Sequence, residues 1–247
     1  MEKHELIRRA EDLRDRAERS GSVTHTGFLT PAERYQLETW ARHGGCRVVF
    51  SGGGPDCERT AAFFLPDWLE EEAFEPAEFL SAIQIDAYFG TPGHRDYLGA
   101  LLGMGVGREW LGDLRVEGDR AYLFCFPSVL RHLLTIDKVG RVSVKAKERS
   151  LAEIPAPVRQ VRQESFSVMS LRLDAVLAGM FHLSRTEAAR QIEAGAVSVN
   201  YEECLKTDRT VREGDVISLR GAGKGSVTGT GGTSRKGRLF VYAEILK

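Results

Sequence analysis

Two arginines in the C-terminal third of the chain are predicted at positions where a positive charge is unfavourable. Arg172 falls in the first turn of one predicted helix and Arg185 in the first turn of the next. A helix start carries free N–H groups and the positive end of the helix dipole, so it attracts anions and a cation there opposes its own dipole. Two helix starts that bind phosphate together would explain this placement, and two solvated arginines would also produce it.

The boundaries of the second helix are predicted from its end residues. Ser184 is a suitable N-cap, and Glu187 can reach back to the N–H of the cap, which makes a capping box. Gly195 stands where a helix ends in the left-handed conformation, and residues 197–199 alternate as a strand. The sequence therefore predicts a helix from Ser184 to Gly195 that is followed directly by a strand.

One face of this helix is expected to pack and another to bind. Ala188 and Ile192 recur at helical spacing on a narrow apolar stripe, while Thr186 and Arg190 lie four residues apart on a different face. The candidate RNA-binding residues are Arg172, Ser184, Arg185, Thr186, Arg190, Lys206 and Arg220. The secondary candidates are Arg141, Lys145, Lys224, Arg235 and Lys236.

The order of residues around the two helices resembles a known RNA-binding domain, the one named after ribosomal protein S-four. The resemblance is carried by Leu171-Arg172-Leu173-Asp174, Leu183-Ser184-Arg185-Thr186, Ala188, Ile192, Gly195, Val197, Val199, Asn200 and Gly214-Asp215. The same domain occurs in pseudouridine synthases, tyrosyl-tRNA synthetases and a heat-shock ribosome factor. It therefore implies RNA as a partner without implying a particular task.

Over nearly its full length the chain resembles the YlmH family of Gram-positive bacteria, also called the RqcP-type ribosome quality-control factors. The further residues that carry this resemblance are Phe28-Leu29-Thr30-Pro31, His94-Arg95-Asp96 and Leu98-Gly99-Ala100. The resemblance implies a non-catalytic factor of the large ribosomal subunit that binds ribosomal RNA and peptidyl-tRNA while C-terminal tails are added to stalled chains. It implies a monomer with no cofactor.

Composition places any RNA contact in a limited part of the surface. The 247 residues carry a formal net charge of −1, which argues against a protein that binds nucleic acid with its whole surface. Residues 165–247 are net +3 and residues 1–164 are net −4. An excess of +3 is small, so the positions of the arginines matter more than the bulk charge.

Cysteine spacing and hydropathy exclude several other classes. Cys46, Cys57, Cys125 and Cys204 show no Cys-x-x-Cys spacing, so we expect reduced core thiols and no metal site. The N-terminus is charged from Glu2 onward, and no apolar run approaches the roughly 18 residues that span a bilayer. We therefore expect a cytoplasmic protein without a membrane partner.

The pattern of elements predicts an α+β protein of three domains. Residues 1–75 are predicted to form a small α/β domain. Its first half contains two helices, one after the other. Residues 76–157 read as strand-helix-strand-strand-helix-strand, the ferredoxin-like plan shared with the RNA-recognition motif, with a last strand at Val139–Val144. Residues 158–247 read as the S-four-type RNA-binding domain, in which two helices precede strands.

The ferredoxin-like plan raises the question of base stacking. Tyr122, Phe124 and Phe126 alternate on the strand that presents stacking aromatics in RNA-recognition motifs. However, Leu123 stands where that motif has a small residue, and one sheet face must bury apolar side chains against helices. We therefore expect these aromatics to pack in the core. The basic run from Arg141 to Arg149 is compatible with a solvated strand end or with a phosphate-facing edge.

The segment from Gly221 to Gly237 is predicted to be a mobile loop. Seven of its residues are glycines, which leave little apolar surface to fold and the largest conformational entropy to lose. Lys224, Arg235 and Lys236 keep positive charge in this loop.

Two other functions are compatible with parts of the sequence. A pseudouridine synthase or other RNA-modifying enzyme would need a catalytic aspartate in a large separate β-rich domain, and the first 164 residues are already assigned to two small units. No catalytic residue is therefore predicted. A protein-protein scaffold would fit the acidic first part of the chain and an older association of relatives with cell division.

Overall fold

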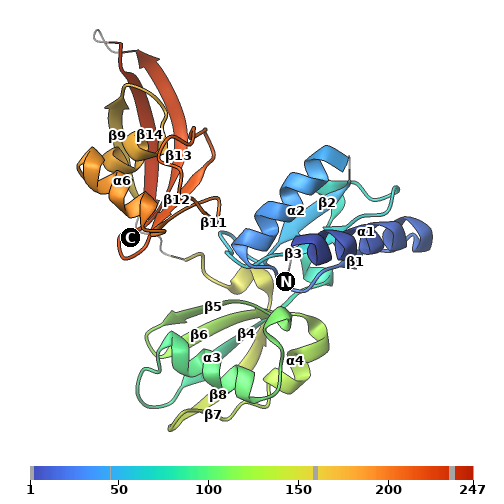
Figure 1. The fold of residues 1–247 in the computed structure, drawn as a ribbon. Coiled ribbons are helices and arrows are strands. Elements are labelled where there is room, and N and C mark those ends of the chain that lie inside the picture. The colour runs from blue at the N-terminus through green and yellow to red at the C-terminus, as the bar shows by residue number, and fades with distance from the viewer. Residues whose placement is uncertain (1–2, 45, 158–160, 234–236, 247) are drawn as a thin grey trace. The chain divides into compact units, whose positions relative to one another are not determined.

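The chain forms two compact units, Met1–Pro157 and Val158–Lys247 (Figure 1). The computed structural model describes residues 3–44, 46–157, 161–233 and 237–246. Helices and strands are mixed in both units, as the sequence predicts. Among the described residues, no helix combines the length and the apolar character needed to cross a membrane.

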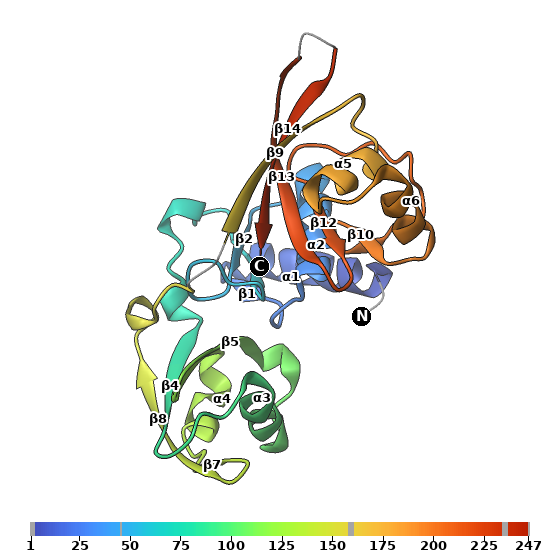
Figure 2. The ribbon, with the colours of Figure 1, turned by 90° about the vertical axis from the view of Figure 1, so that its left-hand side faces the viewer.

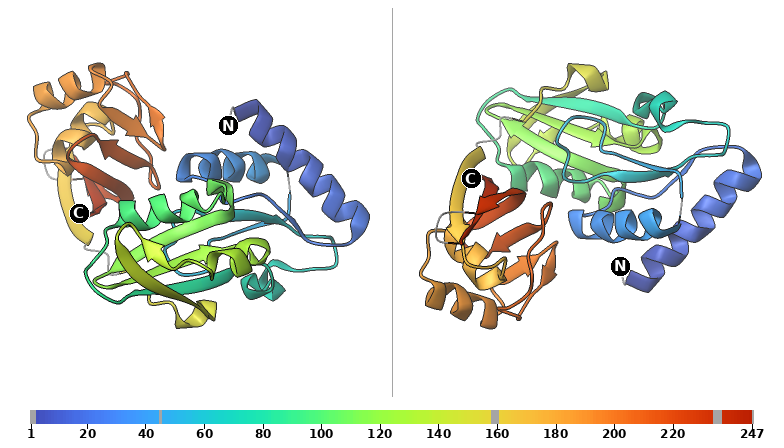
Figure 3. Two further views of the ribbon diagram at one scale, coloured as in Figure 1. Left: turned by 90° about the horizontal axis from the view of Figure 1, so that it is seen from below. Right: turned by 90° about the horizontal axis from the view of Figure 1, so that it is seen from above.

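The first part of the N-terminal unit is a three-stranded antiparallel sheet in the order β1-β3-β2, with two helices on one face (Figure 3). Its elements are α1 (Lys3–Ser20), β1 (Thr24–His25), α2 (Pro31–Gly44), β2 (Val48–Ser51) and β3 (Ala61–Phe64). Side chains alternate along β3, so Ala62 and Phe64 pack beneath the helices while Ala61 and Phe63 face the other way. Thr30 is the N-cap of α2: its N–H donates to the Glu33 carboxylate, and its hydroxyl accepts from the Glu33 N–H.

Residues 76–157 have the predicted ferredoxin-like plan. The elements are β4 (Ser81–Ala87), α3 (His94–Gly103), β5 (Leu111–Glu117), β6 (Arg120–Cys125), α4 (Pro127–Leu133), β7 (Lys138–Val139) and β8 (Val142–Arg149). The strand order is β5-β6-β4-β8-β7 and every pairing is antiparallel. Short 3-10 turns lie at Glu71–Ala73, Pro76–Glu78, Arg108–Trp110 and Leu151–Glu153.

The last predicted strand of this plan was misplaced. The sequence predicts one strand at Val139–Val144, but a hairpin occupies these residues, because Gly140 takes a positive φ of 60° and turns the chain between β7 and β8. The basic run from Lys145 to Arg149 therefore lies inside β8 instead of at a strand end. Arg141 sits in the turn itself and is exposed.

The two faces of the larger sheet have different covers. Helices α3 and α4 lie side by side on one face (Figures 1 and 2) and bury Ile83, Ile85 and Leu123 beneath Tyr97 and Leu101. The opposite face carries aromatic side chains and packs on residues from the first 75 positions of the chain. This second core contains Tyr122, Phe124, Phe126, Ala82, Leu80, Phe28, Phe63 and Phe74.

The aromatic row on β6 is buried, as expected, but its partners differ from the prediction. Tyr122 and Phe124 pack against β3 and its neighbours, on the face that α3 and α4 do not cover. Residues 1–75 and 76–157, predicted as two domains, thus share one core within the N-terminal unit. The side chains that stack bases in an RNA-recognition motif are unavailable here because Tyr122, Phe124 and Phe126 are buried in this shared core.

The C-terminal unit is one six-stranded antiparallel sheet with a helix pair against it. Its elements are β9 (Val161–Val168), α5 (Leu173–Met180), α6 (Arg185–Glu193), β10 (Val197–Val199), β11 (Glu202–Glu203), β12 (Val216–Leu219), β13 (Gly223–Thr233) and β14 (Leu239–Leu246). The order is β11-β10-β12-β13-β14-β9. Leu173, Val176, Leu177, Ala188 and Ile192 bury the helix pair in the core of this unit.

The prediction of a mobile glycine-rich loop is wrong for the residues the structure describes. Residues 223–233 form β13, which pairs with β12 on one side and with β14 on the other. The glycines suit this strand because neighbours occupy the space of a side chain. A Cβ on Gly231 would lie 2.8 Å from the Tyr242 ring, and one on Gly225 would lie 2.8 Å from Met180. Tyr242 and Met180 thus supply apolar contacts that the glycines, which have no side chain, cannot make.

Candidate RNA-binding site

The two helix starts have the local structure that their sequences favour. Arg172 is the N-cap residue of α5, in extended conformation, and Ser184 is the N-cap of α6. The Ser184 hydroxyl accepts a hydrogen bond of 3.1 Å from the Glu187 N–H. Gly195 has a φ of +69° just after α6, as predicted. Both predicted ends of α6 are therefore confirmed.

Only half of the predicted capping box forms. The Glu187 carboxylate accepts from Arg190 at 2.9 and 3.0 Å and from the Gln191 amide at 2.7 Å, so it points along the helix and away from the cap. A charged partner one turn further on binds this carboxylate more strongly than a backbone N–H does. These hydrogen bonds and the charge of Arg190 lower the pKa of Glu187.

The two arginines at the helix starts share one carboxylate. Arg172 donates from Nε and Nη2 to Asp174 at 3.2 and 3.3 Å. Arg185 donates from the same two atoms to the same carboxylate at 3.2 and 3.4 Å. Asp174 lies in the first turn of α5 with its side chain only 8% exposed, whereas the arginine side chains are 39% and 58% exposed. The buried carboxylate binds both guanidinium groups and so holds them in fixed orientations at the surface.

Asp174 is ionised despite its burial. Burial acts to raise the pKa of Asp174, but the hydrogen bonds and charges of Arg172 and Arg185 outweigh it, and the pKa lies below the usual aspartate value. Bonds to Asp174 occupy Nε and Nη2 of each arginine. Among the residues the structure describes, no acceptor binds Nη1 of either one. Each arginine therefore keeps donors for an anion outside the unit.

The two helix starts differ in whether their backbone is free. The N–H groups of Leu173 and Asp174 donate to the carbonyls of Arg209 and Thr207 at 2.9 and 3.0 Å, so the start of α5 is closed to an external anion. The N–H groups of Arg185 and Thr186 have no acceptor among the described residues, and both residues are exposed. An anion can therefore meet backbone donors only at the start of α6.

The same backbone contacts bring further cations to the site. The segment 206–209 runs beside the start of α5, where Arg172 forms an isolated bridge with Thr210. Lys206 lies in this segment and is exposed, as a residue that binds RNA must be. Arg209, three residues later, is half-buried. Lys206, Arg172 and Arg185 are thus gathered around the closed and open helix starts.

Two other predicted residues lie elsewhere on the unit. Arg190 is exposed on α6 but is paired with Glu187. Arg220 follows β12 and donates to the carbonyl of Gly195 at 3.4 Å, so it lies at the opposite end of α6 from Arg185. The nine residues of α6 separate these ends by about 13 Å. The structure therefore does not place Arg220 with the helix starts.

The secondary candidates are divided between the two units. Arg141 and Lys145 belong to the N-terminal unit and are exposed on the hairpin of β7 and β8. Lys224 lies in β13, opposite Ser218 and Leu246. Arg235 and Lys236 lie outside the described residues.

Asp174 and Arg209 are the residues of this site that the sequence analysis did not select. Asp174 was quoted only as part of a pattern, although an acid two residues after Arg172 is a signal for an ion pair. The pairing with Arg185 is eleven residues distant and crosses the break between two helices, so no periodicity indicates it. In the part of the chain that the structure describes, no cluster of His, Cys, Asp and Glu could hold a metal ion.

A helix pair that offers fixed arginines at its starts, followed by short antiparallel strands, defines an RNA-binding protein with an S4 domain. The S4 domain model matches residues 171–217. A second model, described as "Putative RNA-binding domain in YlmH", matches residues 70–153. The chain is 30% identical over 225 residues to the "Ribosome-associated protein quality control protein P2" of Bacillus subtilis (strain 168), covering 90% of this chain and 87% of the relative. The chain belongs to the YlmH family.

A solved structure shares the fold. The "Cell division protein ylmH from Streptococcus pneumoniae" superposes with a TM-score of 0.54 at 21% identity. The superposition covers 62% of this chain and 94% of the other. At this identity the likeness supports the architecture alone.

Proposed function

We propose that this protein is a non-catalytic factor that binds the large ribosomal subunit through the helix starts of its C-terminal unit. It contacts ribosomal RNA and peptidyl-tRNA there and acts in ribosome-associated quality control, while C-terminal tails are added to stalled chains. The name of the Bacillus subtilis relative supports the process, and the S4 domain supports the RNA partner. The proposal includes a cytoplasmic protein that acts as a monomer.

The shared carboxylate of Asp174 is the observation that carries this proposal. Two guanidinium groups that a buried acid holds in place lose little conformational freedom when they bind phosphate, so their binding costs less entropy. The free amides of Arg185 and Thr186 add neutral donors at the same place. A phosphate that bridges these groups would receive hydrogen bonds from side chain and backbone together.

Co-sedimentation with purified large ribosomal subunits tests the proposal. Arg185→Gln removes one charged donor pair, and we expect the affinity to fall about tenfold or more, the weight of one hydrogen bond to a charged group. The matched control is Arg131→Gln on α4, because Arg131 is exposed and belongs to the N-terminal unit. The control should bind like the parent protein.

Salt dependence gives a second measurement on the same samples. If Arg172, Arg185 and Lys206 each neutralise one phosphate, the logarithm of the affinity should fall against the logarithm of salt with a slope of roughly −2 to −3. Arg185→Gln should make that slope shallower by roughly one unit or slightly less. An affinity that ignores both salt and Arg185→Gln contradicts the proposal.

A further inference from the structure

Half of one sheet face in the N-terminal unit is open and carries charge. On the face away from α3 and α4, the N-terminal segment covers the end of the sheet that holds Ala82 and Phe124. The other end of the same face is uncovered. Side chains at this end include Arg120 on β6 at 53% exposure and Lys147 on β8 at 41% exposure. We name the surface formed by Asp86, Tyr88, Arg120, Lys145 and Lys147 the open face.

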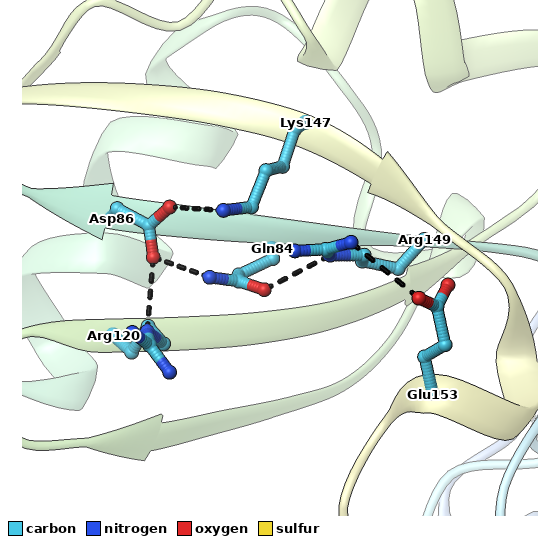
Figure 4. Close-up of polar contacts among 6 residues, drawn as sticks. All are labelled: Gln84, Asp86, Arg120, Lys147, Arg149 and Glu153. Carbon is cyan, nitrogen blue, oxygen red and sulfur yellow. Dashed lines mark hydrogen bonds and ion pairs between the residues drawn. The ribbon is translucent and has the colours of Figure 1, made fainter.

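A carboxylate in the middle of the open face holds two of its cations (Figure 4). Asp86 accepts from Arg120 Nε at 3.1 Å and lies 2.8 Å from Lys147 Nζ. The amide of Gln84 also donates to Asp86, and its oxygen accepts from Arg149 at 3.1 Å. Arg149 in turn reaches Glu153 at the covered end. The network fixes side chains from three neighbouring strands in one plane.

Strand register extends this surface beyond the network. Lys145 lies directly opposite Asp86, so it points to the same face, and it is exposed. No ion pair involving Lys145 occurs among the described residues. The pairing continues past β4, because the N–H of Tyr88 donates to the carbonyl of Ser143 at 3.1 Å. Since side chains alternate, Tyr88 follows Gln84 and Asp86 on the open face, where it is 58% exposed.

The open face therefore combines three cations, one acid and one exposed aromatic ring. Tyr88 and the neighbouring Phe89, which is exposed to 85%, place two aromatic rings in contact with solvent at this end of the sheet. Two further acids border the surface: Glu117 lies opposite Arg120 on the edge strand β5, and the exposed Asp119 precedes Arg120 and accepts through its backbone carbonyl from the Ala87 N–H at 2.8 Å. Lys145 and Arg120 lie opposite Asp86 on the two strands that flank β4, so cations stand on both sides of this strand two residues before Tyr88.

We propose that the open face binds single-stranded RNA, with a base stacked on Tyr88 and phosphates bound by Lys145, Lys147 and Arg120. An aromatic ring beside cations on a sheet is the combination that holds single strands, because every base has a face to stack and every linkage a phosphate to bind. An acidic protein segment would use the cations and leave the ring without a role. The surface and the helix starts belong to different units, so either site can fail in experiment without the other.

Fluorescence anisotropy with the full-length protein and a labelled 12-nucleotide single-stranded RNA tests this proposal. Tyr88→Ala should weaken binding about fivefold or more, the lower end for loss of one stacked base, while Tyr88→Phe keeps the ring and should bind like the parent. The same Tyr88→Ala change should leave the affinity for a blunt RNA duplex unchanged. Arg131→Gln on α4 is the control, since Arg131 is exposed on the helical side of the sheet.

Two charge variants test the electrostatic part. Lys145→Gln with Lys147→Gln should weaken binding and make the salt slope shallower by roughly 1.4, which is two cations at about 0.7 each on a single strand. Asp86→Asn should strengthen binding, because it frees Arg120 and Lys147 from their acid. A gain of affinity in a variant with an unchanged unfolding temperature cannot be attributed to loss of structure, so this variant guards against a trivial explanation.

Several results would overturn the proposal. The first is that Tyr88→Ala binds RNA as tightly as the parent protein. The second is that Arg131→Gln loses as much affinity as Tyr88→Ala. The third is that Asp86→Asn, with an unchanged unfolding temperature, gains no affinity. Competition by a polyglutamate peptide of matched charge as effective as that of unlabelled RNA would assign the surface to acidic proteins instead. If a charge variant fails to fold, the Tyr88→Ala and Tyr88→Phe pair still decides, since Tyr88 is mostly exposed. Subunit sedimentation with Arg185→Gln reports separately on the helix starts.

Discussion

Asp174 in the C-terminal unit and Asp86 in the N-terminal unit solve a similar problem in different surroundings. Each carboxylate is held by two cationic side chains, Arg172 with Arg185 in one case and Arg120 with Lys147 in the other. The Asp174 side chain is 8% exposed, whereas that of Asp86 is 33% exposed. Water can replace the partners of Asp86 and has little access to Asp174.

This difference in burial separates two uses of one arrangement. When a buried ion pair loses one partner, water cannot reach the remaining group to replace the lost hydrogen bonds. The Asp174 cluster therefore stabilises the start of α5. A half-exposed cluster gains little stability from its ion pairs because water screens them. The Asp86 cluster therefore acts mainly on what the surface can bind.

The largest expected effect is on stability when Asp174→Asn removes the buried charge. We expect the free energy of unfolding of the C-terminal unit to fall by about 1–3 kcal/mol, the cost of unsatisfied groups at a buried hydrogen-bonding site. The three tryptophans, Trp40, Trp68 and Trp110, all lie in the other unit. Hydrogen exchange of peptides from residues 170–217 is therefore the suitable measurement.

A matched variant controls for charge alone. Asp208 is an exposed acid near Arg172, and Asp208→Asn should change the free energy of unfolding by less than about 0.5 kcal/mol. An Asp174→Asn protein that exchanges as slowly as Asp208→Asn would show that the burial of Asp174 contributes no stability.

A smaller effect is expected in acid. The pKa of Asp174 is lower in the folded unit than the usual aspartate value near 3.9, so its contribution is fully present above about pH 4 and is lost as the pH falls through the folded value. The parent protein and Asp174→Asn should therefore differ in stability at pH 6 and converge only as the pH falls below the folded pKa of Asp174. A difference that persists unchanged at pH 2 would mean that the ionised carboxylate is not its cause.

The smallest effect on stability is predicted for Asp86, the more exposed of the two carboxylates. Asp86→Asn should change the free energy of unfolding of the N-terminal unit by less than about 0.5 kcal/mol, because an asparagine oxygen can still accept from Gln84 and water reaches the site. Tryptophan fluorescence during urea denaturation measures this unit directly, since all three tryptophans report on it. A loss as large as that expected for Asp174→Asn would remove the distinction between the two clusters.

Local signals predicted the elements well and the tertiary partners poorly. The caps at Thr30 and Ser184 and the positive φ of Gly195 depend on neighbours within a few residues. The pairing of Asp174 with Arg185 and the close packing of Gly53 and Gly54 on the Phe124 ring depend on residues that are distant in the chain. No periodicity in one sequence encodes such contacts.

The glycine-rich segment shows the same limit from the other side. Its composition predicts a loop, but its described residues form a strand, because the apolar surface comes from Tyr242 and Met180 on other elements. A strand of small residues forms where its neighbours supply what it lacks. The same reasoning predicts that shortening residues 223–232 would remove a central strand and disrupt the unit.

The pairing of β9 with β14 sets an order on biosynthesis. β9 is the first strand of the C-terminal unit and an edge of its sheet, and its partner is the last strand, Leu239–Leu246. During translation, residues 161–168 must wait for about seventy more residues before their hydrogen-bonding groups are paired. An incomplete chain released before residue 239 therefore presents an unpaired strand edge, a surface prone to aggregation.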